Sequence, residues 1–387
     1  MKIGFRLTGG DEWQAGISYL SVLLHALRQS YEDRVKICLL APGNKSRALE
    51  DLSPMADEVL PIPTFRRWTI SWGIDCAMKR TFSRDLLGAR ILRRHKIDAV
   101  FGLCMQCRYD GIPTLSWVYD FQHVHMPEMF SLQERLMRDW VFSQTARLST
   151  RIIVTSDAVK KDFDSFFPKY AHKAKVLKTA SYIPQSVYEI QPQSITRLYQ
   201  LPEKFVYLPN QFWKHKNHEL AFEAVKLLKD RGIEVFVVCS GYQGDYRHPD
   251  YFTDLLRKVS DWRIGDQIKL LGLVPRDHVF QLMRQSVCVL NPSLFEGLGL
   301  SVDEGRSIGK KLLLSDIPAH REQCAPQSVF FDPRNLEDLA EKLKAVWHDT
   351  LPGPHAEFEI EARESFPQRS AACAESFMAV VREVASG

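Results

Sequence analysis

The stretch NPSLFEGLGLSVDEG, residues 291–305, directly follows the strand-like run 287–290 and leads into a helical pattern. Gly297 and Gly299 allow backbone amides to approach a ligand closely, and the positive N-terminal end of the next helix attracts negative charge. A strand, a glycine turn and a helix in this order are typical of the phosphate-binding turn of a doubly wound α/β sheet.

Two glutamates frame these glycines. Glu296 precedes the first glycine and Glu304 lies in the first turn of the predicted helix, so both carboxylates can accept hydrogen bonds from one polyhydroxyl ligand. Ser301 and Glu304 also have the spacing of a capping box, which would explain Glu304 without a ligand. Glu296 has no such explanation, because an acidic residue between Phe295 and Gly297 serves no obvious packing purpose.

Strand-like and helix-like segments alternate on both sides of this stretch. Alternation of this kind predicts parallel sheets covered by helices. In the first half we expect strands at 2–7, 35–40, 99–103, 114–118 and 151–155. In the second half we expect strands at 205–208, 235–239, 268–271, 287–290 and 312–314, and helices at 218–230, 251–262, 278–285, 302–308 and 336–348.

The chain has 387 residues, more than one hydrophobic core usually serves, so we expect two α/β domains. Prolines and polar residues break the pattern between them. We therefore expect an N-terminal domain over 1–184, a linker over 185–201 and a C-terminal domain over 202–365. Residues 357–385 are helix-compatible, with Pro367 as an expected interruption.

Composition narrows the function classes. The apolar fraction of 45% and charged fraction of 25% are ordinary for a globular protein, and a net charge of +4 is too small to indicate a nucleic-acid partner. No apolar run approaches eighteen residues and the N-terminus lacks a signal-peptide pattern, so we expect a cytoplasmic protein, with peripheral contact at the inner face of the membrane as an option. Cys104 and Cys107 have CxxC spacing but lack a second pair, so we expect no metal site.

A basic turn, LPNQFWKHKNH at 208–218, follows the first strand of the second domain. Lys214 and Lys216 could neutralise a departing diphosphate there, since no metal-ligand set is visible. The alternative is an ordinary solvated turn.

The paired glutamates, with seven residues between them, lie within FEGLGL and DEG and resemble the signature of retaining glycosyltransferase family 4, glycosyl transferases group 1. The resemblance covers most of 205–335 and includes LGLV at 271–274 and LSDIPAHRE at 314–322. It implies the GT-B fold, α/β, with two Rossmann-like doubly wound domains facing a central cleft. A C-terminal helix, about 366–387 here, would cross back onto the first domain.

The resemblance also implies roles for individual residues. Glu296 would contact the donor sugar, Glu304 the ribose, and Val274 the base. The backbone of Gly297, Leu298, Gly299 and Leu300 would meet the sugar and the phosphates.

In the basic turn, Lys216 matches the family lysine, but Gln211 stands where the family has an arginine. We count Gln211 with the donor-binding residues and expect Lys214 to supply the missing charge.

The first domain carries a loop, SWVYDFQHVHMPEMF at 116–130, that resembles the acidic and histidine-containing loop of the family. Asp120 and His123 are the catalytic candidates in it, although a lone loop histidine is more often structural. Gly16, with Gly9 and Gly10, belongs to a glycine-containing turn that would meet the donor phosphate.

The resemblance implies a retaining glycosyltransferase of polysaccharide biosynthesis, and the basic turn without a metal-ligand set predicts that it is metal-independent. It would need no cofactor and would use a nucleotide diphosphate sugar as co-substrate with a glycan or lipid-linked acceptor. Trp68 and Trp72, among Arg66, Arg67, Lys79 and Arg80, could dock such an acceptor or simply face solvent. The alternatives are a nucleotide-sugar-binding protein without turnover, which Gln211 makes thinkable, and a related epimerase or phosphorylase.

Overall fold

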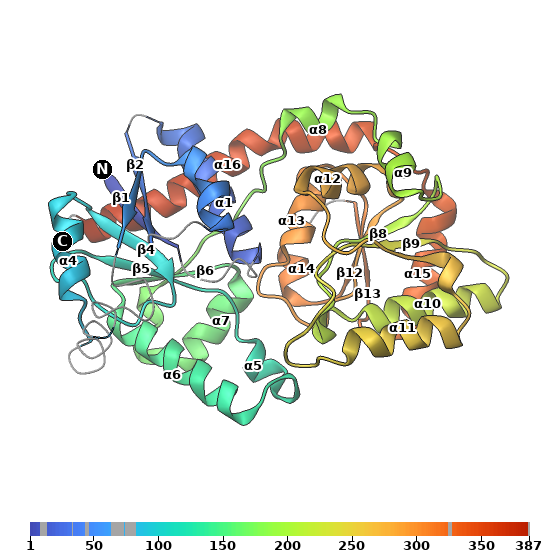
Figure 1. The fold of residues 1–387 in the computed structure, drawn as a ribbon, viewed down its shortest axis with the longest axis horizontal. Helices are drawn as coiled ribbons and strands as arrows, with labels where there is room; N and C mark the ends of the chain where they lie inside the picture. The colour runs from blue at the N-terminus through green and yellow to red at the C-terminus, as the bar shows by residue number, and fades with distance from the viewer. Residues whose placement is uncertain are drawn as a thin grey trace. The chain divides into compact units, whose positions relative to one another are not determined.

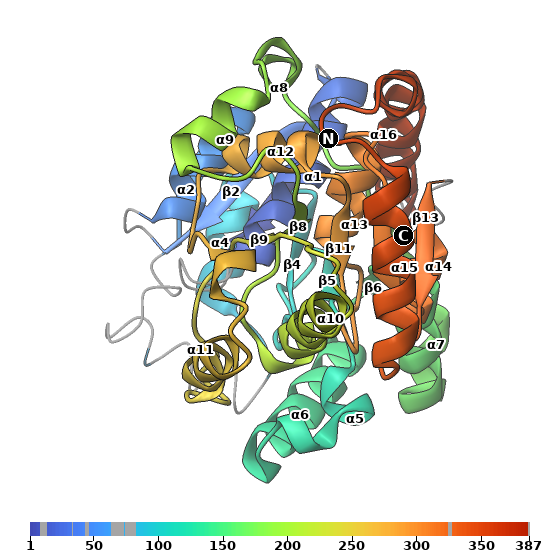
Figure 2. The same cartoon turned by 90° about the vertical axis from the view of Figure 1, so that its right-hand side faces the viewer.

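The computed structural model describes residues 1–7, 14–32, 34–42, 46–62, 73, 83–323 and 327–385. The chain divides into two compact units. Unit 1 comprises Met1–Val124, Ser131–Ala180 and Gln368–Gly387, and unit 2 comprises His125–Phe130 and Ser181–Pro367. Each unit is built on one parallel sheet with helices on its faces, which confirms the predicted pair of Rossmann-like folds (Figure 1, Figure 2).

The sheet of unit 1 has seven strands in the order β3-β2-β1-β4-β5-β6-β7. All pairings are parallel. The strands are β1 (Lys2–Arg6), β2 (Lys36–Ala41), β3 (Glu58–Pro61), β4 (Ala99–Leu103), β5 (Thr114–Val118), β6 (Arg151–Val154) and β7 (Ala174–Val176). The central strands are near-continuous apolar runs because both of their faces are buried.

The helices of unit 1 follow the strands in turn. They are α1 (Gln14–Tyr31), α2 (Arg47–Leu52), α4 (Leu86–Arg94), α6 (Leu132–Leu148) and α7 (Asp157–Phe166), with 3-10 turns at Ser53–Met55 and Pro168–Lys173. The short helix α5 (Gln122–His125) ends at the first residue of the segment that belongs to unit 2, and this segment contains the 3-10 turn Pro127–Met129. Ser131 caps α6 in a capping box with Glu134. The last residues of the chain complete the core of this unit, since Phe377 packs against Phe5 and Phe101.

The sheet of unit 2 has six strands in the order β10-β9-β8-β11-β12-β13, again all parallel. They are β8 (Val206–Leu208), β9 (Val237–Cys239), β10 (Ile268–Leu270), β11 (Val289–Asn291), β12 (Leu312–Ser315) and β13 (Ser328–Phe331). The helices are α8 (Gln185–Glu189), α9 (Gln193–Tyr199), α10 (His218–Asp230), α11 (Tyr251–Asp261), α12 (Arg276–Gln285), α13 (Leu300–Ser307), α14 (Pro318–Gln323) and α15 (Leu336–Asp349). Short 3-10 turns lie at Lys214–Lys216 and Gly265–Gln267.

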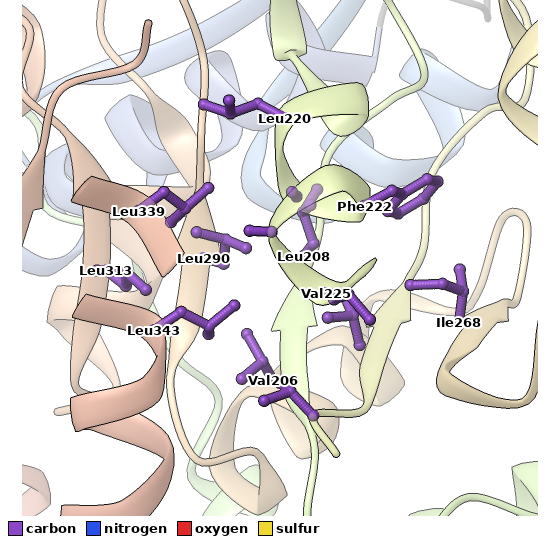
Figure 3. Packing of buried hydrophobic residues seen from close by; sticks show 14 of the residues in the cluster. Val206, Leu208, Leu220, Phe222, Val225, Ile268, Leu290, Leu313, Leu339 and Leu343 are labelled. Carbon is purple, nitrogen blue, oxygen red and sulfur yellow. The ribbon is translucent and has the colours of Figure 1, made fainter. Parts of the chain in front are cut away.

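Alternate residues of a strand point to opposite faces, and unit 2 uses both. Val206 and Leu208 of β8 belong to the cluster that α10 and α15 cover, whereas Phe205 and Tyr207 belong to the cluster on the other face. Figure 3 shows Leu339 and Leu343 of α15 reaching toward the strand side chains in the first cluster.

The structure corrects three expectations about the elements. The expected linker, 185–201, contains the helices α8 and α9. The expected interruption at Pro367 is absent, because α16 runs unbroken from Ala356 to Ala385 with Pro367 inside it. The edge strands β3, β7 and β13 and the helix α14 were not predicted, because they are short and only partly buried.

Candidate functional site

The strand order of unit 2 reverses between β8 and β11, and such a switch point is where doubly wound sheets bind ligands. The chain segments that leave these two strands are joined by side chains. Asn210 lies two residues beyond β8 and donates from Nδ2 to Oδ1 of Asn291, the last residue of β11, over 3.2 Å. Both amides are buried, so the two strand ends are held together at a fixed separation.

Ser301 completes this buried network. Its Oγ accepts from Nδ2 of Asn291 over 3.1 Å and donates to Oδ1 of Asn210 over 3.2 Å. The capping-box interpretation is therefore wrong, because Ser301 lies inside α13 and its hydroxyl is used elsewhere. The N-cap of α13 is Gly299, in the left-handed conformation with φ +82°.

A side chain of α14 holds the glycine turn before α13 through hydrogen bonds. Nε2 of Gln323 donates to the carbonyl oxygens of Leu298 and Gly299. A Cβ atom at Gly299 would lie 3.3 Å from Cδ2 of His320, so both the backbone angle and the space require glycine. The N–H groups of Leu300 and Ser301 donate to no described residue, which is the arrangement that receives an anion at a helix N-terminus.

Lys216 and Glu296 meet beside this turn. Nζ of Lys216 lies 2.5 Å from Oε1 of Glu296, and Oγ of Ser293 donates to the same oxygen over 2.7 Å. The exposed fractions of the two side chains are 19% and 9%. Burial raises the pKa of Glu296, but the charge of Lys216 and the hydrogen bonds from Lys216 and Ser293 outweigh it and hold that pKa below 4.5.

The other residues of the basic turn are less engaged. The side chain of Lys214 is exposed and has no ion pair with a described residue, while its backbone N–H donates to Oδ2 of Asp245 over 3.0 Å. Gln211 is half-buried, and its side chain makes no hydrogen bond to the part of the chain that the structure describes. Of the three predicted residues here, only Lys216 is in contact with a predicted glutamate.

Glu304 is buried in α13 and pairs with an arginine that the sequence did not single out. Nη2 of Arg276 lies 2.7 Å from Oε1 of Glu304. Burial raises the pKa of Glu304 above 4.5, and Arg276 opposes that shift. Val274, two residues before Arg276, is half-buried and packs against the core cluster that contains Phe205 and Tyr207. Its neighbour Leu273 is exposed.

Residues 125–130 belong to unit 2 and lie against Leu294 and Phe295 of the 291–305 stretch. The ring of His125 stacks on Phe295, with centroids 5.2 Å apart, and Met126, Met129 and Phe130 pack with Leu294 and Phe295. The guanidinium of Arg247 lies 4.5 Å from the ring centroid of Phe130 and 4.7 Å from that of Trp213. The only sequence signal for this packing was the aromatic and methionine content of the loop.

In unit 1, Asp120 and His123 are both held by α6. Oδ1 of Asp120 lies 3.6 Å from Nη1 of Arg138 and also accepts from the N–H of Gln122. Nε2 of His123 lies 3.0 Å from Asp139, and its ring packs on Phe142. Burial lowers the pKa of His123 below 6.5. This burial favours a structural role for His123, and its direct catalytic role stays a prediction.

Other predicted residues of unit 1 are only partly described. Gly16 is buried within α1. Gly9, Gly10, Trp68, Trp72, Arg66, Arg67, Lys79 and Arg80 lie outside the described residues.

Unit 1 also contains a hollow of about 1350 Å³ at the carboxyl ends of β1 and β4. One wall is the outer face of α6, with Leu132, Leu136, Met137 and Trp140 all exposed. Arg6 and Arg147 also line it.

Three further observations bear on chemistry and location. Among the described residues, no group of three or more histidine, cysteine or carboxylate side chains is placed to bind a metal ion. Every cysteine in the described part of the chain is a free thiol. No described helix combines the length and hydrophobicity that crossing a bilayer requires.

The family described as Glycosyl transferases group 1 matches residues 196–365. The matched residues cover less than half of the chain and extend from within α9 to within α16. All of the unit 2 network described above, from Asn210 to Gln323, lies within the matched residues.

A curated relative and several solved structures are similar to the chain. The relative is the O-antigen chain mannosyltransferase RfbU of Salmonella typhimurium, 22% identical over 134 residues, which cover 35% of this chain and only 36% of that protein. A glycosyltransferase from Rickettsia africae aligns over 99% of this chain and 98% of its own, with a TM-score of 0.69 and 13% identity. HepE of Anabaena, in complex with UDP and glucose, aligns over 100% and 98%, with a TM-score of 0.65 and 17% identity. These structural likenesses establish the GT-B architecture of the chain.

Proposed function

We propose that this protein is a retaining glycosyltransferase of family 4 that moves a sugar from a nucleotide diphosphate to a glycan or lipid-linked acceptor. The observation that carries the proposal is the ion pair of Lys216 and Glu296 beside the unengaged amides of α13, at the switch point of the second sheet. A cation, two amides and a carboxylate suit a ligand that combines a diphosphate with a polyhydroxyl ring.

The reaction would proceed mainly through positioning and electrostatics. The bond from the anomeric carbon of the donor to the diphosphate oxygen breaks, and a bond from that carbon to the acceptor hydroxyl forms on the same face. The acceptor proton passes to the departing diphosphate. Lys216 and the N-terminus of α13 would stabilise the charge on this leaving group, so no cofactor or metal ion is invoked.

The two glutamates would divide the rest of the donor. The pKa of Glu296 is held below its ordinary value, so the side chain would accept hydrogen bonds from the sugar hydroxyls as a carboxylate. Glu304 would take the ribose hydroxyls, with Val274 against the base. The similarity to HepE, which binds UDP and glucose, supports a nucleotide sugar as donor.

The acceptor would bind in the hollow of unit 1. Its apolar α6 wall suits the lipid part of a lipid-linked glycan, and Arg6 and Arg147 suit a phosphate. The similarity to an O-antigen mannosyltransferase supports an acceptor of this class and a role in polysaccharide biosynthesis. Such a protein would be cytoplasmic, with peripheral contact to the membrane that holds the acceptor.

A second candidate is a nucleotide-sugar-binding protein without turnover. Gln211 favours it, because the matching position holds an arginine in the family and loss of one transition-state charge contact typically costs about 10²–10³ in rate.

A nucleotide-sugar panel tests both candidates. Thermal shift with UDP-, GDP-, ADP- and dTDP-sugars identifies the donor, because a ligand that binds only the folded state raises the melting temperature. Release of nucleoside diphosphate is then measured with and without EDTA, and product anomers are assigned by NMR. We expect EDTA-insensitive release and a retained configuration. Binding without release would favour the second candidate, and no binding to any member of the panel would refute both.

A further inference from the structure

Arg276 occupies an unusual place beside Glu304. It is the first residue of α12, and its guanidinium reaches α13 to lie 2.7 Å from the buried carboxylate. The exposed fraction of the Arg276 side chain is 46%, against 10% for Glu304. One charged end of this pair therefore faces solvent, and the other is enclosed.

The surroundings of Glu304 make the carboxylate dependent on this arginine. Burial and the neighbouring carboxylate of Asp303 both disfavour the ionised form, while Arg276 favours it. The negative charge of Glu304 also opposes ionisation of the nearby Tyr207 hydroxyl, from β8, and contributes to raising the pKa of that tyrosine. Oδ2 of Asp303 accepts a hydrogen bond from Oγ of Ser181 over 2.8 Å.

The orientation of Arg276 is itself fixed. Its guanidinium carbon lies 5.0 Å from the centroid of the buried Phe280 ring, one turn further along α12. A planar guanidinium can rest on a ring and present its N–H groups to a carboxylate at the same time, which a lysine ammonium cannot do in the same way.

We propose that Arg276 is a positioning residue of the donor site. By holding the Glu304 carboxylate as an oriented acceptor for the ribose hydroxyls, it sets the preference of this protein for ribonucleotides over 2′-deoxyribonucleotides. The inference rests on the proposed function, because it needs a nucleotide whose ribose meets Glu304. It assigns the sugar selectivity of the nucleotide to a residue outside the glutamate motif.

The test compares dissociation constants of a ribonucleoside diphosphate and its 2′-deoxy analogue by calorimetry. The probe is whichever of UDP, GDP and ADP binds the wild-type protein best, with the matching 2′-deoxy compound. We expect the wild type to prefer the ribonucleotide by about 10-fold or more, as a hydrogen bond to a charged acceptor provides. Arg276→Met should reduce the preference to about 2-fold, close to the value for Glu304→Gln, and Arg276→Lys should restore part of it.

Asp277→Asn is the matched control, because it alters the neighbouring exposed charge on α12 and should keep the wild-type preference. Circular dichroism confirms folding of each variant, and the Lys variant keeps the test open if Arg276→Met fails to fold. A preference that survives in Arg276→Met and Arg276→Lys but disappears in Glu304→Gln would overturn this inference alone. A wild type that binds no nucleoside diphosphate would overturn the proposed function and the inference together.

Discussion

The ammonium group of Lys216 lies 2.5 Å from Oε1 of Glu296, although the two residues are 80 positions apart. They meet because β8 and β11 are adjacent parallel strands, and the segments after them leave the same edge of the sheet. The unliganded site therefore already holds a paired charge. A donor would exchange part of this pairing for contacts with its phosphate and its sugar.

Breaking this pair should reduce both stability and turnover. The pKa of Glu296 lies below 4.5, so the pair stabilises the fold above that pH, and the contribution is lost as the pH falls through the lowered pKa. Lys216→Met should lower the melting temperature at pH 7.5 and reduce the single-turnover rate by about 10²–10³. The double variant Lys216→Met/Glu296→Gln should regain stability but not turnover. A double variant that regains both would make the pair purely structural.

Variants of Lys214 and Gln211 test whether Lys214 supplies the charge that an arginine provides in the proposed family. If Lys214 reaches the leaving diphosphate, Lys214→Ala slows the chemical step by about 10²–10³ and Gln211→Arg adds little. Single-turnover rates with saturating donor measure both. A silent Lys214→Ala together with a faster Gln211→Arg would show that the exposed lysine does not contribute.

Glu304→Gln should weaken donor affinity and, at neutral pH, stabilise the unliganded protein. The pKa of Glu304 is raised, so its stabilising contribution is present below the unfolded value and is lost as the pH rises through the folded value. Glutamine imitates the protonated acid at every pH. The melting temperature of the variant relative to wild type should therefore rise between pH 4 and pH 7.5. A variant that is less stable than wild type at pH 7.5 would contradict this.

His218 should make the protein sensitive to mild acid. It is fully buried with its ring stacked on Phe212, centroids 4.1 Å apart, and burial lowers its pKa from 6.5 to about 3. A histidine with a lowered pKa costs stability as the pH falls below 6.5, because only the unfolded chain takes up the proton.

Between pH 7.5 and pH 5.5 this linkage is worth about 1.4 kcal/mol for one histidine. His218→Phe should remove about that much of the acid-induced loss, measured by urea unfolding at the two pH values. His172→Gln, at an exposed position, serves as the control. Equal acid-induced losses in wild type and His218→Phe would refute the assignment.

The sequence was informative wherever a pattern is local. The helix over 218–230 and the strands over 99–103 and 114–118 have the predicted bounds, because each combines strong apolar periodicity with clear ends. Lys216 and Glu296 were predicted as site residues from the stretch of sequence around each of them. Their direct contact could not be, since it depends on the order of strands in the sheet.

What the sequence could not show were partners supplied by distant segments. Arg276 precedes the helix predicted over 278–285 and was not singled out, and only the fold brings it to Glu304. Ser301 illustrates the opposite error. Its spacing to Glu304 fits a capping box, but the buried amides of Asn210 and Asn291 compete for the hydroxyl and the helix begins two residues earlier than predicted.

The helix α16 gives the chain an order of assembly during synthesis. Unit 2 is finished once the ribosome has released residue 367, whereas unit 1 waits for Phe377 to fill the space between Phe5 and Phe101. The unit that is translated first is thus the last whose core can close. Until then its nascent strands carry an unfilled apolar surface, and a premature stop codon between positions 368 and 377 would leave that surface open for chaperones and proteases.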